Sequence, residues 1–179
     1  PESANLTHPE RVTDIHRSYI DAGARLIRTN TFASNTTLLS SDWNAVESNI
    51  HAAVKLAKDA VNDKDVFIAG DIGPIPEHSP RNTNIDLLAE EYYRIAELFA
   101  KEGLSILTFE TFPDMEHILP AISRIKEEYS LFIMVQFCVD QFGYSASGLS
   151  AKKLLTDAAS IPEIDAIGLN CGVGPGHMA

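Results

Sequence analysis

The sequence predicts an α/β fold, and more narrowly the part of a (β/α)8 TIM barrel that runs from about the first helix to the sixth strand. Short apolar stretches alternate with amphipathic ones along all 179 residues. The apolar stretches are nearly continuous, which is typical of parallel strands covered on both faces. The chain opens on a helical pattern and closes on a strand pattern, which a complete open sheet rarely does.

The first predicted element is a helix. Its start is marked by THPE at residues 7–10, which has the form of a capping box and places a proline in the first turn. Apolar residues then recur at helical spacing over 12–20, and Gly23 is placed to end the helix. A short strand and turn follow at 25–32.

The remaining elements alternate in the same way. The predicted order is helix 46–57, strand 66–74, helix 87–99 ending near Gly103, strand 105–112, helix 115–125, strand 131–139, helix 149–160 and strand 166–171. The longest loop, 75–84, follows the C-terminal end of a strand, where an active-site loop would lie.

Two architectures fit this order, an open doubly wound sheet and part of a barrel. A complete barrel needs about 250 residues, more than this sequence has. The chain has no strand before its first helix and no helix after its last strand. We therefore expect one incomplete barrel domain over residues 1–179, without strand 1 and without units 7 and 8.

Composition limits the classes of function. The net charge is −11, so the chain lacks the basic face of a nucleic-acid binder and is unsuited to anionic lipid. No apolar run approaches the roughly 18 residues of a membrane span. Two cysteines are too few for a disulfide framework, and 45% apolar residues suffice for a core. We predict a soluble, cytoplasmic protein that binds neither nucleic acid nor membranes.

Polar residues follow four of the five predicted strands. They are Thr29 to Thr31, Asp71, Glu110 with Thr111, and Asn170 with Cys171. In α/β barrels the active site lies at the C-terminal ends of the strands, so these groups are candidates to hold a polar ligand. The alternative is that they hold turns or cap the following helices.

Glu110 and Cys171 differ in what position alone indicates. Glu110 follows an apolar strand, and a buried carboxylate needs a partner. That partner is either a substrate ammonium or a nearby Arg or Lys. From its position alone, Cys171 is interpreted as a small buried thiol. A zinc site would need about four ligands, and a catalytic thiolate would need a nearby base, but no Cys-His pair is evident. Cys138, inside a predicted apolar strand, is expected to be inert.

Four stretches together resemble the homocysteine S-methyltransferase family. They are NLTHPERVTDIHRSYIDAGARLIRTNTFASN (5–35), AGDIGP (69–74), FETFPDMEHILPAI (109–122) and IGLNCGVGPGHM (167–178). The similarity is spread over nearly the whole chain, in the family's order. That family includes the homocysteine-binding module of cobalamin-dependent methionine synthase and betaine–homocysteine methyltransferase.

The resemblance implies zinc-dependent methyl transfer to the thiol of homocysteine, giving methionine. It places a catalytic Zn2+ at the C-terminal mouth of the barrel, held in the family by three cysteines. Cys171 matches the first of these, in the strand-6 motif. The adjacent pair that follows strand 8 in the family has no counterpart in this sequence.

The resemblance also implies roles for other residues. Glu110 matches the glutamate that pairs with the substrate ammonium. Thr29, Asn30 and Thr31 match a turn whose backbone N–H groups and hydroxyls bind the substrate carboxylate. Asn170 would orient the zinc loop from behind the ligand, and Asp71 would lie near the substrate as support for its turn.

The methyl donor stays open, because relatives use methylcobalamin, methyltetrahydrofolate, betaine or S-methylmethionine. A cobalamin or folate donor would be supplied by further domains, which the same polypeptide could carry. One alternative is a non-catalytic or truncated barrel fragment that acts as a binding or assembly piece, which the missing cysteine pair favours. Another is a phosphate-binding enzyme. Only the stretch GVGPG supports it, and this stretch lacks the glycine spacing of a dinucleotide-binding or P-loop motif.

Overall fold

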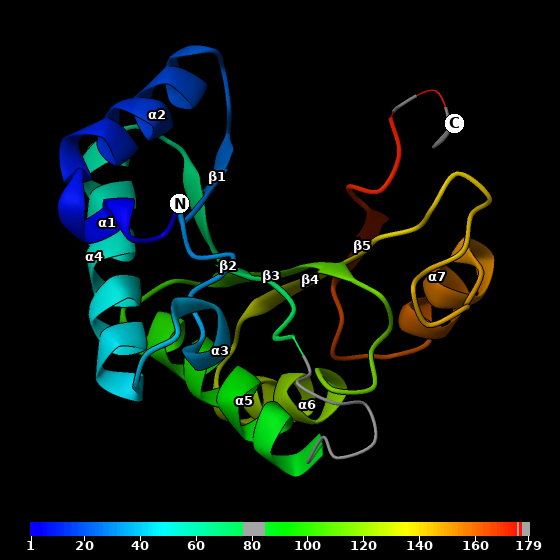
Figure 1. Ribbon diagram of the computed structural model, residues 1–179. Helices are drawn as coiled ribbons and strands as arrows, with labels where there is room; N and C mark the ends of the chain where they lie inside the picture. Colours follow the sequence, from blue (N-terminus) through cyan, green and yellow to red (C-terminus); the bar gives the residue numbers. More distant parts are fainter. Residues whose placement is uncertain (77–84, 175, 177–179) are drawn as a thin grey trace.

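The computed structural model describes residues 1–76, 85–174 and 176, and helices alternate with strands within them (Figure 1). The helices are α1 (Ala4–Thr7), α2 (Pro9–Asp21), α3 (Thr36–Leu39), α4 (Trp43–Val61), α5 (Ile85–Lys101), α6 (Leu119–Glu128) and α7 (Ala151–Ala159). The strands are β1 (Leu26–Arg28), β2 (Phe67–Ile72), β3 (Ile106–Phe112), β4 (Phe132–Phe137) and β5 (Ala166–Leu169). Over the described ranges, no helix is both long and apolar enough to cross a membrane.

All five strands are parallel and lie in the order β1-β2-β3-β4-β5. Each crossover therefore moves one strand further in the same direction. A doubly wound sheet reverses its order at a switch point, whereas a barrel adds its strands one after another. Figure 1 shows α4, α5, α6 and α7 following one another along the outer side of this curved sheet. The predicted class, part of an α/β barrel, is confirmed.

The main core lies between the sheet and these outer helices. Phe99 of α5, Leu107 and Phe109 of β3, and Ile122 of α6 are completely buried in it. Gly70 of β2 allows α5 to come this close, because a Cβ at that position would lie 2.6 Å from the Phe99 ring. The apolar strands and the amphipathic helices thus share one packed layer.

The opposite, concave face of the sheet carries polar side chains. The register pairs Arg28 with Ala69 and Asp71 with Thr108. Alternate residues of a strand share a face, so Arg28, Asp71 and Glu110 project from the same side. All three lie in the C-terminal halves of their strands, where the predicted site was placed.

The start of α2 differs from the prediction. Residues 4–7 form a helical turn of their own, so Thr7 ends α1 and its hydroxyl donates to the Ser3 carbonyl at 3.0 Å. His8 is the N-cap of α2 and makes no side-chain capping bond. The capping-box prediction was wrong for this reason. Pro9 in the first turn and Gly23 just beyond the end of α2, with φ of +100°, are confirmed.

Smaller differences concern single positions. Helix α6 begins only at Leu119, because Pro120 fixes its first turn, so Met115 precedes it. Leu87, the first apolar residue of the predicted helix 87–99, lies in α5 and is exposed. Cys138 lies one residue beyond β4 and not inside it. Most of the predicted loop 75–84, namely 77–84, lies outside the described residues.

Candidate substrate-binding site

A cavity of about 1040 Å³ opens on the concave face, at the C-terminal ends of the strands. The predicted site residues that line it are Thr29, Asn30, Asp71, Glu110, Asn170 and Cys171. Thr31 is buried and is not among the lining residues. Helix α2 contributes Arg11 and His16 to the wall, and its N-cap residue His8 lines the cavity as well. Like Thr31, Thr111 does not line the cavity, so the structure gathers six of the eight polar residues predicted at the strand ends around one space.

A β-bulge in β3 directs Glu110 into the cavity. Between Phe109 and Phe112, β3 advances three residues while β4 advances two. The extra residue is Thr111, whose φ of +69° is rare for a β-branched side chain. Phe109 and Phe112 can then both pack in the outer core, with ring centroids 6.1 Å apart. Glu110, between them, faces the other way.

Asn170, just after β5, holds this bulge in place. Its Oδ1 accepts a hydrogen bond from the Thr111 backbone N–H at 2.9 Å. Its Nδ2 donates to Glu110 Oε2 at 2.7 Å and to Thr111 Oγ1 at 3.0 Å. A bulge removes a residue from the ladder, and the Asn170 side chain supplies the missing partner. The Glu110 carboxylate is thereby fixed relative to the end of β5.

Two buried carboxyl groups, those of Asp71 and Glu110, share the cavity. Burial is the largest influence on the Asp71 pKa and the Glu110 charge comes next; together they raise it to about 8, while Arg28 lowers it. Asp71 is therefore mostly protonated at pH 7. Its buried Oδ1 has no hydrogen-bond partner within the described part of the chain.

Glu110 has a protein partner, because Arg28 forms an ion pair with its Oε2. This is the arginine alternative that the sequence left open for the carboxylate. The Glu110 side chain is only 10% exposed, whereas that of Arg28 is 47% exposed. Both residues still line the cavity, so the pair remains within reach of a ligand.

The hydroxyls of Thr29 and Thr31 are used inside the fold. Thr31 Oγ1 donates to the Asp71 carbonyl at 2.7 Å, and Thr29 Oγ1 accepts from the Asp71 N–H at 3.0 Å. The two hydroxyls lie 2.7 Å apart, so the Thr29 proton is directed to Thr31 Oγ1. These bonds tie the end of β1 to β2 and position Asp71.

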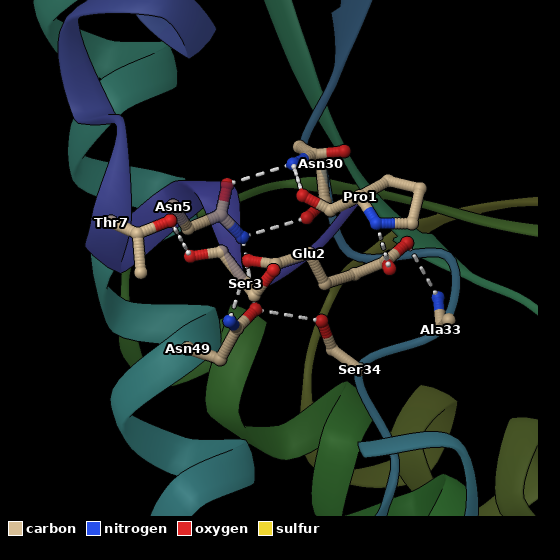
Figure 2. A network of polar contacts seen from close by, with 9 residues as sticks. All are labelled: Pro1, Glu2, Ser3, Asn5, Thr7, Asn30, Ala33, Ser34 and Asn49. Carbon is tan, nitrogen blue, oxygen red and sulfur yellow. Dashed lines mark hydrogen bonds and ion pairs between the residues drawn. The ribbon is translucent and has the colours of Figure 1, made fainter.

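A polar network holds the segment after β1 from the other side, as Figure 2 shows. Asn5 Nδ2 donates to the Asn30 carbonyl at 2.8 Å and to Asn49 Oδ1 at 2.9 Å. Asn49, on α4, donates to the Glu2 carbonyl at 2.8 Å and accepts from the Ser34 hydroxyl at 2.9 Å. Asn30 is therefore placed by the N-terminal residues and α4 together.

Cys171 is exposed at the cavity and has a φ of +57°, which is rare for a residue other than glycine. Thr111 Oγ1 lies 3.7 Å and Asn170 Nδ2 3.8 Å from its sulfur, as weak donors. At Gly172, with φ of +70°, a Cβ would lie 2.1 Å from the Val139 carbonyl oxygen. Only glycine fits there, and this close turn presents the Cys171 thiol to the cavity.

The donor set of the described residues fits zinc only in part. Zinc takes about four ligands and favours thiolate and imidazole, and Cys171 offers one such group. No cluster of three His, Cys, Asp or Glu side chains able to hold a metal ion occurs among the residues that the structure describes. Cys138 is half-buried, and burial, followed by the charge of Cys171, raises its pKa. Cys138 is thus kept a neutral thiol.

Two cavity residues, Arg28 and His16, were not predicted from the sequence. Arg28 could have been found from strand alternation, because it precedes the Thr29–Thr31 turn on the face that later carries Asp71. His16 falls in helical register with Val12 and Ile20, which are both buried. Burial lowers the pKa of His16, and its Nε2 has no partner among the described residues.

Comparison with known proteins identifies the sequence family of this chain. Residues 2–179 match the sequence family described as homocysteine S-methyltransferase. The chain is 26% identical over 184 residues to betaine–homocysteine S-methyltransferase 1 of Xenopus tropicalis, and 25% identical over 185 residues to the protein of that name from Xenopus laevis. Each alignment covers 98% of this chain but 44% of the relative, so the chain spans less than half of these relatives' length.

Solved structures of homocysteine methyltransferases have a similar fold. The metallated form of the homocysteine methyltransferase MmuM from Escherichia coli has a TM-score of 0.81 at 18% identity, covering 98% of this chain and 67% of that one. Its apo form has a TM-score of 0.78 at 20% identity, covering 99% and 67%. The fold likeness and a family match over nearly every residue lead to one conclusion: this chain belongs to the homocysteine S-methyltransferase family.

Proposed function

We propose that this chain forms the homocysteine-binding part of a methyltransferase, which transfers a methyl group to the thiol of homocysteine and yields methionine. The observation that carries the proposal is one cavity bordered by a buried carboxylate, Glu110, and a cysteine thiol, Cys171, with Asn170 in contact with both. A site for an amino acid with a thiol side chain needs an anionic group near the substrate ammonium. It also needs a group near the substrate sulfur that can activate the thiol. Family membership supports this reading.

In this proposal, Glu110 accepts hydrogen bonds from the substrate ammonium. A carboxylate in a largely buried position forms strong charge-assisted bonds of this kind. Asp71 remains protonated beside it and adds no second negative charge. Thr29, Asn30 and Thr31 shape the wall next to the substrate, with the threonine hydroxyls holding the Asp71 backbone.

We further propose that zinc is the cofactor and that Cys171 is one of its ligands. Zinc lowers the pKa of a thiol that it binds, and it would thus supply the nucleophilic thiolate at neutral pH. Asn170 and Thr111 would orient the Cys171 sulfur through their contacts with it. The two further cysteines that the resemblance implies are not among the residues of this sequence.

The methyl donor is proposed to be one of methylcobalamin, methyltetrahydrofolate, betaine and S-methylmethionine. Two relatives are named for betaine, which makes betaine the first donor to assay. A cytoplasmic location is proposed from the two unpaired cysteines, since thiols persist in reducing compartments.

Homocysteine binding to the full-length protein, measured by titration calorimetry, tests this function. Glu110→Gln keeps the shape of the side chain and removes its charge, so homocysteine should bind about tenfold or more weakly. Glu116→Gln, at an exposed position after the same strand, is the matched control and should bind as the wild type does. A wild-type protein that binds no homocysteine and forms no methionine with any of the four donors would leave a binding or assembly piece as the better account.

A further inference from the structure

We propose that Arg28 binds the α-carboxylate of the amino-acid substrate, directly beside the ammonium site at Glu110. This inference rests on the proposed function and adds a residue that determines specificity for it. Arg28 would select ligands that carry both charged groups of a free amino acid over amines or thiols that carry one.

The guanidinium group of Arg28 keeps N–H donors that the described residues do not use. Arg28 ends β1 on the concave face and lines the cavity. A guanidinium group has five N–H donors. Over the described residues, its hydrogen bonding is limited to one contact, from Nη1 to Glu110 Oε2. The side chain is half-exposed, so the other donors are free to meet a carboxylate in the cavity.

The hydroxyls of Thr29 and Thr31, which were expected to bind the substrate carboxylate, have no proton left for it. Thr31 donates its proton to the Asp71 carbonyl, and Thr29 directs its proton to Thr31. A carboxylate accepts hydrogen bonds and donates none. Another cationic or N–H group of the cavity must therefore bind it, and Arg28 adjoins the same turn.

Arg28 is also the basic residue of the cavity that adjoins Glu110. The ammonium and carboxylate of an amino acid sit on one carbon atom, so their protein partners must be neighbours. The other basic side chains of the wall are Arg11 and His16 of α2 and its N-cap residue His8. His16 is held neutral by burial, and neither His8 nor Arg11 contacts Glu110 within the described structure. Arg28 is in direct contact with Glu110.

The balance of charge in the cavity also favours Arg28. Arg28 and Glu110 form a neutral pair, and a zwitterionic amino acid is neutral as well. Binding would replace one ion pair with an alternating arrangement of four charges, without adding net charge to a partly buried site. Arg28 can also bind a carboxylate through two parallel N–H bonds, which suits a planar group.

The test compares three ligands in the full-length protein by titration calorimetry. The ligands are homocysteine, 3-aminopropane-1-thiol, which lacks the carboxylate, and 4-sulfanylbutanoic acid, which lacks the ammonium. Arg28→Gln should weaken homocysteine and 4-sulfanylbutanoic acid about tenfold or more, and should leave 3-aminopropane-1-thiol unchanged or tighter. Arg28→Lys should recover part of the affinity, because it keeps the charge without the planar fork.

Arg25→Gln is the matched control, since Arg25 pairs with Asp65 at the exposed surface, and all three ligands should bind it as they bind the wild type. An equal loss for all three ligands in Arg28→Gln would assign Arg28 a purely structural role and overturn the inference. Tighter homocysteine binding in Arg28→Gln would overturn it too, by making Arg28 only a competitor for Glu110. A wild-type protein that binds none of the ligands would overturn the proposed function itself.

Discussion

The buried carboxyl group of Asp71 makes the stability of the protein depend on pH in an unusual direction. Its pKa is raised to about 8 in the fold, chiefly by burial, whereas an unfolded aspartate titrates near 4. Between these values the folded state holds a proton that the unfolded state has lost, so stability falls as pH rises from about 4 to 8. The neutral carboxyl is the form that suits the site.

Asp71→Asn should remove this dependence, because the amide keeps the shape and donor of the protonated acid and cannot ionise. We expect the variant to melt at a higher temperature than the wild type at pH 8, with the difference shrinking toward pH 4. Asp63→Asn, at an exposed position, is the control and should show no such trend. A melting difference that is the same at every pH would contradict the account.

At single positions, the sequence indicated which residues belong to the site, but not which hydrogen-bond and ion-pair partners they have. It placed Glu110, Asn170 and Cys171 at strand ends, and the structure brings them together. It did not indicate that Arg28 reaches Glu110 across β2, or that the Thr29 hydroxyl would be used by Asp71. Such contacts depend on the register between strands, which hydrophobic patterning leaves open.

At the scale of elements, the bulge of β3 and the end of β5 depend on each other through Asn170. Asn170→Ala would leave the Thr111 N–H and the Glu110 carboxylate without this partner. We expect a loss of roughly 1–3 kcal/mol in the free energy of unfolding, measured with urea. Asn44→Ala, on the exposed face of α4, should change stability little. An unchanged stability in Asn170→Ala would mean that the bulge holds without the side chain.

The network of Figure 2 gives a second prediction at this scale. Asn49→Ala removes the side chain that joins α4 to the Glu2 carbonyl, to Asn5 and to the Ser34 hydroxyl. The buried groups left unpaired should cost about 1–3 kcal/mol in the free energy of unfolding. Ser48→Ala, one residue earlier and facing solvent, is the control. Equal unfolding curves for both variants would show that the network does not stabilise the segment after β1.

The sequence predicted the strands and the long helices, and it missed the two short helices. Helices and strands with a clear apolar period lie where expected, apart from their ends. The four-residue helices α1 and α3 were not predicted, because one turn is too short to show a period. Helix α3 has a local signal that could have been used: Asn35 Oδ1 accepts from the Leu38 N–H at 2.8 Å as an N-cap.

For the whole molecule, the curved sheet leaves apolar side chains exposed near the N-terminal ends of its strands. Leu26 is 37%, Phe67 57% and Phe132 45% exposed. These residues occupy the first positions of β1, β2 and β4, and β1 and β5 form the two edges of the sheet. Open edges beside apolar surface favour association with another chain.

We therefore expect a polypeptide of residues 1–179 alone to self-associate in analytical ultracentrifugation. Replacing Phe67 and Phe132 by Lys should lower the association, whereas the same change at the exposed Phe142, in the loop after β4, should not. A monomer at high concentration with a cooperative melt at high temperature would contradict this expectation.

The architecture followed from the sequence because order and periodicity are properties of whole segments. Parallel strands separated by helices could still have formed a doubly wound sheet, and the strand order of the folded chain confirmed the predicted barrel. The assembly of the site was less accessible, since it depends on a bulge at Thr111 and a turn at Cys171 with unusual backbone angles. The periodicity of apolar residues does not predict backbone angles at single positions.

The most direct test of the proposed function is the zinc content of the full-length protein, with homocysteine binding followed on the same samples. We predict about one zinc per wild-type chain, and the loss of both metal and homocysteine binding in Cys171→Ser. Cys138→Ser, the matched control at the half-buried cysteine, should keep both. A Cys171→Ser protein that retains zinc and binds homocysteine as the wild type does would contradict the account.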